Sequence, residues 1–391
     1  MAKSAQLGLH TWLPDAMEAP TPVSALLHAA TMVTAGVFLM VRISPLLDYT
    51  PLTREIITIV GTLTIVVMAA MACVQNDIKR IIAYSTGSQL GYMFMAIGLT
   101  GYNAAMFHLT THAFFKAALF LGAGSVIHAM SDEKDIQKMG GICQYIPLTC
   151  LMMWIGSLSL VGMPLFAGFY SKDLILEMGW MSPFSLGKMA FAMGLFGVIL
   201  TAFYTWRLLL LTFQGAPRAD DAVMSHLKES PPIMLAPLMV LSAISLLVGP
   251  SLFGLFSSET LNPPLWVVWI PTLMAAFGIG MAYLFYRVTP SLPERLQSTF
   301  QGIYDFFFHQ GYIDALYNVL FVTPSLKLGK LLWEEGDQDI IDGLGPNGLA
   351  TLTQTSGRLV SRLQTGRLTH YAFAMVLGLA SAVGWYLWGA L

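Results

Sequence analysis

The sequence YNAAMFHLTTHAFFKAALFLGAGSVIHA, residues 102–129, combines two properties that rarely occur together. It is long and apolar enough to cross a bilayer, since a spanning helix needs about 20 mostly apolar residues. Three titratable side chains nevertheless stand inside it, at His108, His112 and Lys116. Ionisable residues at such depth are costly in lipid and usually serve a function. The segment therefore predicts a membrane helix that carries a polar pathway.

The composition of the whole chain also predicts a membrane protein. Hydrophobic residues make up 55% of the 391 residues and charged residues only 11%, against about 25% charged residues in an average soluble domain. The net charge of −2 gives no indication of a nucleic-acid partner. The apolar runs are continuous rather than alternating, which predicts an all-α polytopic bundle of about nine spanning helices. The candidate spans are 21–42, 55–75, 80–100, 102–129, 145–165, 186–213, 232–256, 264–287 and 369–390.

Basic residues in the connections predict the orientation. Before the tail, one set of connections holds seven of them, namely Lys79, Arg80, Lys134, Lys138, Arg207, Arg218 and Lys228. The alternate set holds three, namely Arg42, Arg54 and Lys188. Because Lys and Arg accumulate in cytoplasmic connections, the first set is predicted to face the cytoplasm.

Residues 291–391 differ from the preceding spans. A single helical stripe is formed by Leu352, Leu359, Val360 and Leu363. The stripe predicts an amphipathic helix that lies along the membrane or along a partner, and the Gly343–Gly348 segment with Pro346 predicts a break in it. The final apolar run from about residue 369 would return through the bilayer as an anchor.

His108, His112 and Lys116 recur every four residues. Each step of four turns the direction by only about 40° on an α-helix, so the three side chains share one face over roughly 12 Å. Histidine changes charge near neutral pH, which suits a proton path. The alternative is that both histidines are packing residues and that Lys116 pairs with an acid elsewhere. We favour the proton path because a lysine at mid-span cannot reach the interface at low cost.

A second candidate site lies in GMPLFAGFYSKD, residues 162–173. Pro164 between two glycines removes helical hydrogen bonds and predicts a broken helix. Broken helices form ion sites in transporters, and Lys172 and Asp173 follow this break directly. The alternative places both residues at a membrane interface. Taken alone, His28 would be a packed core histidine and Lys3 a surface lysine.

The three cysteines predict neither a metal site nor a disulfide framework. Cys73, Cys143 and Cys150 lack metal-ligand spacing and are few in number. We interpret them as apolar packing residues.

Several long motifs resemble the antiporter-like membrane subunits of respiratory complex I. They occupy residues 3–33, 77–86, 108–116 and 166–173, and the match extends over essentially the whole chain. The tail, with Gly311-Tyr312-Ile313-Asp314 and the block at 339–343, resembles the chain L (mitochondrial chain 5) group of that family.

The resemblance implies a fold of two inverted five-helix repeats, of which only the second is complete here. Residues 1–53 would end the first repeat, 54–213 would form the second, 214–290 would add further transmembrane helices, and 291–391 would form a lateral amphipathic helix with its anchor. The helix that carries the glutamate partner of Lys3 is absent, so we expect an N-terminally truncated chain. The implied proton relay consists of Lys3, His28, His108, His112, Lys116, Lys172 and Asp173.

The resemblance further implies a proton-translocating subunit of NADH:quinone oxidoreductase that binds no cofactor itself. NADH, FMN, iron–sulfur clusters and quinone would be bound by partner subunits. The partners would be other membrane subunits, contacted partly through the lateral helix, and the lipid bilayer, with no nucleic acid. We expect a multi-pass protein of the bacterial cytoplasmic membrane. Two alternatives remain: a subunit of a multi-subunit sodium/proton antiporter, and a non-conducting structural fragment.

Overall fold

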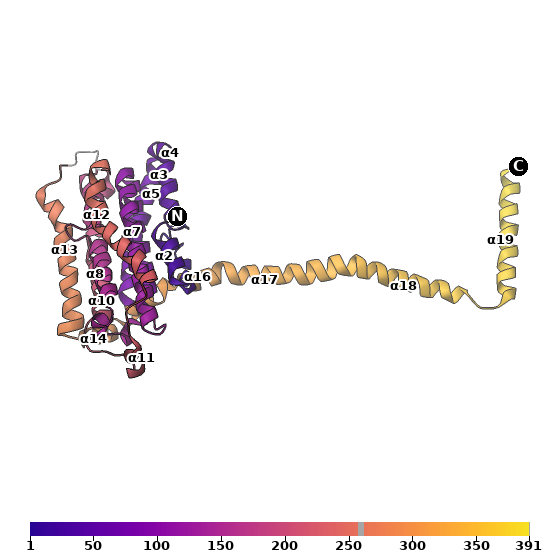
Figure 1. Cartoon of the computed structure of the whole chain (residues 1–391). Coiled ribbons are helices and arrows are strands. Elements are labelled where there is room, and N and C mark those ends of the chain that lie inside the picture. The colour runs from indigo at the N-terminus through magenta and orange to yellow at the C-terminus, as the bar shows by residue number, and fades with distance from the viewer. Residues whose placement is uncertain (257–261, 391) are drawn as a thin grey trace. The chain divides into compact units, whose positions relative to one another are not determined.

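The computed structural model describes residues 1–256 and 262–390. Within these ranges the regular elements are all helices, and strand pairing is limited to one isolated bridge between Asp77 and Asp135. The predicted all-α class is confirmed. The chain divides into two units, Met1–Asp314 and Ala315–Leu391, which are described separately (Figure 1).

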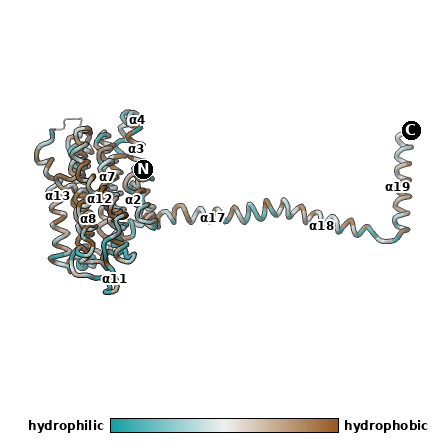
Figure 2. The backbone as a smooth tube through the Cα atoms, in the orientation of Figure 1, coloured by the Kyte–Doolittle hydropathy of each residue, from teal (hydrophilic) through white to brown (hydrophobic). Residues whose placement is uncertain are grey.

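Long helices build the first unit, and Figure 1 shows them side by side in one bundle. They are α5 (Pro51–Val74), α6 (Ile78–Gly98), α7 (Tyr102–Ala129), α10 (Ser185–Phe213), α12 (Pro232–Phe256) and α13 (Leu265–Tyr283). In the described part of the chain, six helical segments are long and apolar enough to cross a membrane. They are α5, α7, α10, α12, α13 with the turn that follows it, and α19 (Leu368–Gly389). Figure 2 shows the apolar residues concentrated along the bundle helices and polar ones near α11 (Asp221–His226).

Three predicted spans take a different form. The span at 80–100 is the helix α6, which is almost wholly buried but richer in polar residues. The span at 145–165 corresponds to the shorter α8 (Pro147–Val161). The span at 21–42 is not continuous, because it divides into α2 (Thr21–Ala29) and α3 (Ala35–Arg42).

Local hydroxyl groups account for the interruption between α2 and α3. Thr34 Oγ1 donates to the Ala30 carbonyl at 2.5 Å, and Thr31 Oγ1 donates to the Leu26 carbonyl at 2.9 Å. Ser4 Oγ donates to the Val33 carbonyl at 2.6 Å. Such side-chain bonds offer the backbone an alternative to the helical pattern, which an apolar run alone does not reveal.

Helix α6 occupies the centre of the bundle between α5, α7 and α10. Its first turn is capped by the Asp77 carboxylate, which accepts from the Lys79 and Arg80 backbone N–H groups at 2.7 and 3.1 Å. Glycines let α5 and α6 approach closely, since a Cβ on Gly61 would lie 2.6 Å from the backbone nitrogen of Met95.

Short helices connect the long ones and close the unit. They are α1 (Trp12–Asp15), η1 (Ala16–Glu18), α4 (Ser44–Asp48), η2 (Ile136–Lys138), η3 (Ile142–Gln144), α9 (Ala167–Met181), α11, η4 (Leu284–Val288), α14 (Leu292–Thr299), α15 (Gln301–Phe308) and η5 (Gln310–Tyr312). The first compact unit thus reaches Asp314, beyond the predicted boundary at 290, and α15 packs against α5.

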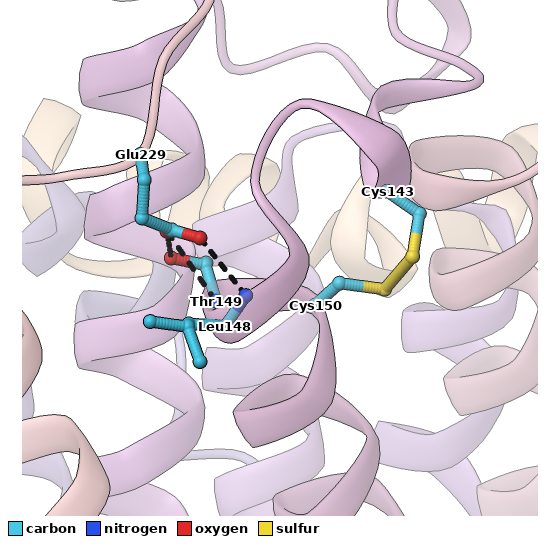
Figure 3. The surroundings of a disulfide bond; sticks show 5 residues. All are labelled: Cys143, Leu148, Thr149, Cys150 and Glu229. Atoms are coloured by element: carbon cyan, nitrogen blue, oxygen red, sulfur yellow. Dashed lines mark hydrogen bonds between the residues drawn. A yellow bond between two sulfur atoms is a disulfide. The ribbon is translucent and has the colours of Figure 1, made fainter.

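The interpretation of the cysteines was wrong for two of the three. Cys143 in η3 and Cys150 in the first turn of α8 form a disulfide, whereas Cys73 is free (Figure 3). The turn between η3 and α8 brings the two Cα atoms to 5.5 Å, within the range a disulfide spans. Beside it, the Glu229 carboxylate caps α8 by accepting from the backbone N–H of Leu148 at 2.9 Å.

In the second unit, helical residues continue from α16 (Ile313–Tyr317) through η6 (Asn318–Val322), α17 (Thr323–Leu331) and η7 (Leu332–Leu344) to α18 (Pro346–Leu363). The predicted break is confirmed, because Gly345 leaves the helical conformation with ψ −110° and α18 begins at Pro346. The apolar stripe of α18 is exposed, for example at Leu352 and Val360.

Candidate functional site

Helix α7 carries the row of titratable residues through the bundle. It packs against α2, α6, α8, α9 and α12. His108, His112 and Lys116 are all 0% exposed. The four-residue spacing therefore directs three ionisable side chains into the protein interior and none of them to lipid.

His108 connects three helices. Its Nε2 lies 3.0 Å from Gln89 Oε1 on α6, and its Nδ1 lies 3.0 Å from Ser171 Oγ on α9. Because an amide oxygen only accepts, Nε2 holds the proton in the neutral ring and Nδ1 accepts from the serine hydroxyl. Thr111 Oγ1 lies 2.8 Å from the same Ser171 Oγ. Hydroxyl groups thus extend the row from α7 to α9.

Lys116 is held by neutral oxygen atoms. Its Nζ donates to Ser85 Oγ and, at 3.4 Å, to the Ile82 carbonyl, both on α6. The ion pairs found in the described residues join Lys138 to Glu133 and Lys330 to Glu334, so none includes Lys116. The alternative in which Lys116 pairs with an acid is therefore not what the structure shows. Among the described residues, no carboxylate forms an ion pair with this ammonium.

His112 and His28 have free ring nitrogens in the interior. His112 Nδ1 lies 3.0 Å from the Ala29 carbonyl of α2, so this nitrogen donates. Its Nε2, and both nitrogens of His28, are buried without a hydrogen-bond partner among the described residues. The His28 ring lies between Trp12 and Phe120, with centroids 6.2 and 5.9 Å away. Buried polar atoms are normally hydrogen-bonded, so these nitrogens are where a water chain can join the row.

Lys172 and Asp173 follow the predicted helix break, which is confirmed. Helix α8 ends at Val161, Gly162 adopts φ 88°, and α9 begins at Ala167. A Cβ on Gly168 would lie 1.7 Å from the Ser159 carbonyl oxygen, so only glycine lets the start of α9 approach the end of α8.

Both charged residues after the break are buried rather than at an interface. Lys172 is 1% exposed and Asp173 5% exposed. In the part of the chain that the structure describes, neither Lys172 Nζ nor Asp173 Oδ2 has a hydrogen-bond partner. The ammonium lies 5.0 Å from the centroid of the Tyr92 ring, a cation–π contact that stabilises positive charge without a carboxylate.

Lys3 is not part of this buried row. Its side chain is exposed, and residues 1–10 form turns, since α1 begins only at Trp12. Positive φ values at Ala5 (46°) and Gly8 (88°) interrupt helical geometry there. The structure thus brings together six of the seven predicted residues in the interior and leaves Lys3 outside.

Several residues around the row were not predicted from the sequence. Ser85 and Gln89 lie four residues apart on α6 and contact Lys116 and His108. Their four-residue spacing, which matches the spacing of His108, His112 and Lys116, was an available signal. No sequence signal identifies Ser171, because its contact with His108 depends on the packing of α9 against α7.

Two further charged residues lie near the row. Lys79 is 3% exposed, and its Nζ donates to the carbonyls of Met17 and Ala19 at 2.5 and 2.7 Å, which anchors the end of η1. Glu177 stands four residues after Asp173 on α9, hence on the same face and one turn further along. Asp173 and Glu177 thus form a short row of carboxyl groups that runs toward the end of α9.

Comparisons with known proteins agree with this geometry. Residues 1–203 match the family model described as NADH:quinone oxidoreductase/Mrp antiporter, TM, and residues 204–383 match NADH dehydrogenase subunit 5 C-terminus. NADH-ubiquinone oxidoreductase chain 5 of Arabidopsis thaliana is 44% identical over 100% of this chain and 62% of its own length. NADH-quinone oxidoreductase subunit L of Rickettsia bellii is 45% identical over 99% and 63%. The chain thus spans about three fifths of the length of these curated relatives.

A solved structure shares the fold. It is the Mrp complex from Dietzia sp. DQ12-45-1b, which is similar with a TM-score of 0.58 and 26% identity over 98% of this chain and 40% of that chain.

Proposed function

The chain belongs to the NADH:quinone oxidoreductase/Mrp antiporter family of membrane proteins, and from this premise we propose that it translocates protons as a membrane subunit of an NADH:quinone oxidoreductase. One observation carries the proposal: Lys116 and Lys172 are buried and form no ion pair among the described residues, and the contact between His108 and Ser171 joins α7, which carries Lys116, to α9, which carries Lys172. Buried cations without counter-ions are expensive and are retained where charge must move. The C-terminal match to subunit 5 supports the oxidoreductase over the antiporter.

Mutual repulsion of the two lysines provides the coupling. Lys116 on α7 and Lys172 on α9 are both buried in the bundle and repel each other electrostatically. Two unit charges about 10 Å apart interact by about 1.7 kcal/mol at an effective dielectric constant of ~20, roughly a tenfold effect on an equilibrium. A proton that arrives on one lysine therefore favours release from the other. Alternate occupation of the two sites moves charge along the row without movement of α7.

The acidic residues of α9 provide the release side. Asp173 stands next to Lys172, and Glu177 follows one turn later. We place proton entry at His28 and His112, which lie toward α2, and release along Asp173 and Glu177. We further propose that Lys3, which is exposed, acts on the entry side ahead of His28.

The redox chemistry is assigned to partner subunits. NADH, FMN, iron–sulfur clusters and quinone would bind there, and this chain would bind none of them. The exposed stripe of α18 would contact another membrane subunit, because an apolar surface of this kind needs lipid or protein cover. We place the chain in a bacterial cytoplasmic membrane, although its relatives come from both bacteria and plants.

A sodium/proton antiporter subunit is the second candidate, favoured by the similarity to the Mrp complex. Purified assemblies in proteoliposomes decide between the two. Lys116→Ala should lower the number of protons moved per NADH oxidised, whereas Lys188→Ala, at an exposed lysine, should not. Normal pumping in the Lys116 variant would refute the proposed role. Sodium-dependent proton exchange without NADH would establish the antiporter instead.

A further inference from the structure

A cavity of about 700 Å³ lies in the first unit, separate from the buried row. It is an open pocket lined by the end of α5, the last turns of α10, η4, α14 and α15. This is the end of the bundle that carries Lys79, Arg80 and Lys134, which the basic residues predict to face the cytoplasm. None of the relay residues lines this cavity.

Two arginines give the cavity a positive end. Arg207 is 5% exposed, its Nη1 donates to the Gln75 carbonyl, and its Nη2 donates to Asn76 Oδ1 at 2.6 Å. Its Nε is buried without a hydrogen-bond partner among the described residues. Arg218 donates from Nε to the Gln137 carbonyl at 2.6 Å, which holds its guanidinium at the rim. Both side chains are therefore positioned before any ligand arrives.

Neither arginine is neutralised by a carboxylate in the described part of the chain. Glu294 is the one acidic residue that lines the cavity, and it is exposed on α14. An arginine that is this deeply buried and lacks a counter-ion favours an anion, and its planar guanidinium suits phosphate in particular.

Much of the remaining lining of the cavity is apolar. Phe203, Phe285, Phe300 and Phe307 line it, from α10, η4, the residue before α15, and α15. Phe203 and Phe285 pack edge to face with centroids 5.5 Å apart. A site that offers guanidinium groups beside phenyl rings fits an amphiphile, because the polar and apolar parts of the ligand each leave water for a matching environment.

We propose that this cavity binds an anionic phospholipid, with its phosphate at Arg207 and Arg218 and an acyl chain along the phenyl rings. Basic pockets between membrane helices on the cytoplasmic side are the expected place for such head groups. A free phosphate ion would leave the apolar wall without a ligand, and a neutral lipid or quinone would leave the two guanidinium groups without an anion. The bound lipid joins α14 and α15 to the bundle. The proposal is independent of proton transfer.

The test uses the complete membrane complex that contains the full chain, depleted of lipid in detergent. It is incubated with phosphatidylglycerol that carries a photoreactive group in one acyl chain, and labelled peptides are identified by mass spectrometry. We expect labelling of peptides within 203–211 and 285–307, and at least about tenfold less label in Arg218→Gln, the cost of one charge-assisted hydrogen bond. Arg295→Gln, a neighbouring arginine outside the cavity, should label normally.

A second variant keeps the charges and fills the apolar part. Ile303 lines the cavity, and Ile303→Trp should reduce labelling while NADH oxidation by the complex shows that assembly is intact. Equal labelling by the photoreactive phosphatidylcholine analogue would overturn the choice of an anionic lipid. Displacement of the probe by millimolar inorganic phosphate alone would show a small-anion site instead. Unchanged labelling in both cavity variants would also overturn the proposal.

Discussion

Replacement of Ser171 by alanine removes the hydroxyl that joins α7 to α9. Ser171 Oγ lies 3.0 Å from His108 Nδ1 and 2.8 Å from Thr111 Oγ1. The change leaves the volume nearly the same and adds no charge. After it, His108 keeps its contact with Gln89 at 3.0 Å and so keeps its ring orientation. What is lost is the side-chain bridge between His108 on α7 and α9, the helix that carries Lys172.

The magnitude follows from the contacts. One net hydrogen bond is worth about 1 kcal/mol, and a buried nitrogen left unpaired costs about 1–3 kcal/mol. If the proton passes through this hydroxyl, the barrier to transfer rises by a similar amount, and each 1.4 kcal/mol slows the step about tenfold. We therefore expect coupled proton movement to slow roughly 10- to 100-fold. Global stability should change by only about 1–3 kcal/mol.

The measurement is the initial rate of NADH-driven acidification of proteoliposomes, followed with an internal pH dye. The matched control is Ser245→Ala, which removes a buried hydroxyl that donates to the Ser242 carbonyl at 2.7 Å on α12, away from the row. Both variants should assemble with similar melting temperatures, and only Ser171→Ala should pump slowly. Equal pumping by the two variants would refute the path through Ser171.

Three further predictions concern stability. Gly168→Ala should prevent normal assembly, because its Cβ would lie 1.7 Å from the Ser159 carbonyl oxygen; a normal yield and melting temperature would contradict the close approach of α9 to α8. Cys143→Ser should lower stability by about 2–3 kcal/mol through loss of the short disulfide loop, and a reducing agent should destabilise the unsubstituted chain equally while leaving Cys143→Ser unaffected. The backbone N–H of Asp135 and the ammonium of Lys138 hold the pKa of Glu133 below its usual value. A depressed carboxyl pKa stabilises the fold at pH values above the unfolded pKa of about 4.3. Glu133→Gln should therefore lower the melting temperature at pH 7, and the difference from the unsubstituted chain should vanish as the pH falls through the folded pKa. A difference that persisted at low pH would rule out the linkage.

The helices were largely predictable because each membrane-spanning helix requires about 20 mostly apolar residues in succession. The run at 102–129 gives α7 almost residue for residue, and the glycines and proline near 162–168 mark the break before α9. Both signals are local, since they depend on length, apolar content and the missing N–H of proline. The burial of His108, His112 and Lys116 on one face follows from their spacing in the same way.

Contacts between helices were beyond such local signals. The partners of His108 lie 19 and 63 residues away, at Gln89 and Ser171, and nothing in either segment indicates that they meet. The disulfide between Cys143 and Cys150 depends on a turn that composition does not encode. The interruption at 30–34 arises from hydroxyl groups that leave the apolar content of the segment unchanged.

That interruption also determines which tautomer His112 adopts. In a continuous helix over 21–42, the Ala29 carbonyl would accept from the backbone N–H of Val33, but here that N–H points to the Leu27 carbonyl at 3.4 Å. The Ala29 oxygen is thereby free to accept from His112 Nδ1, which leaves the Nε2 lone pair as the base. The identity of the side chain at position 29 does not supply this contact, because the backbone carbonyl accepts the bond and Ala29 itself is only buried packing. Substitutions at Thr31 and Thr34 will affect His112 instead, because a change that restores the continuous helix removes the Ala29 carbonyl as the acceptor for His112 Nδ1.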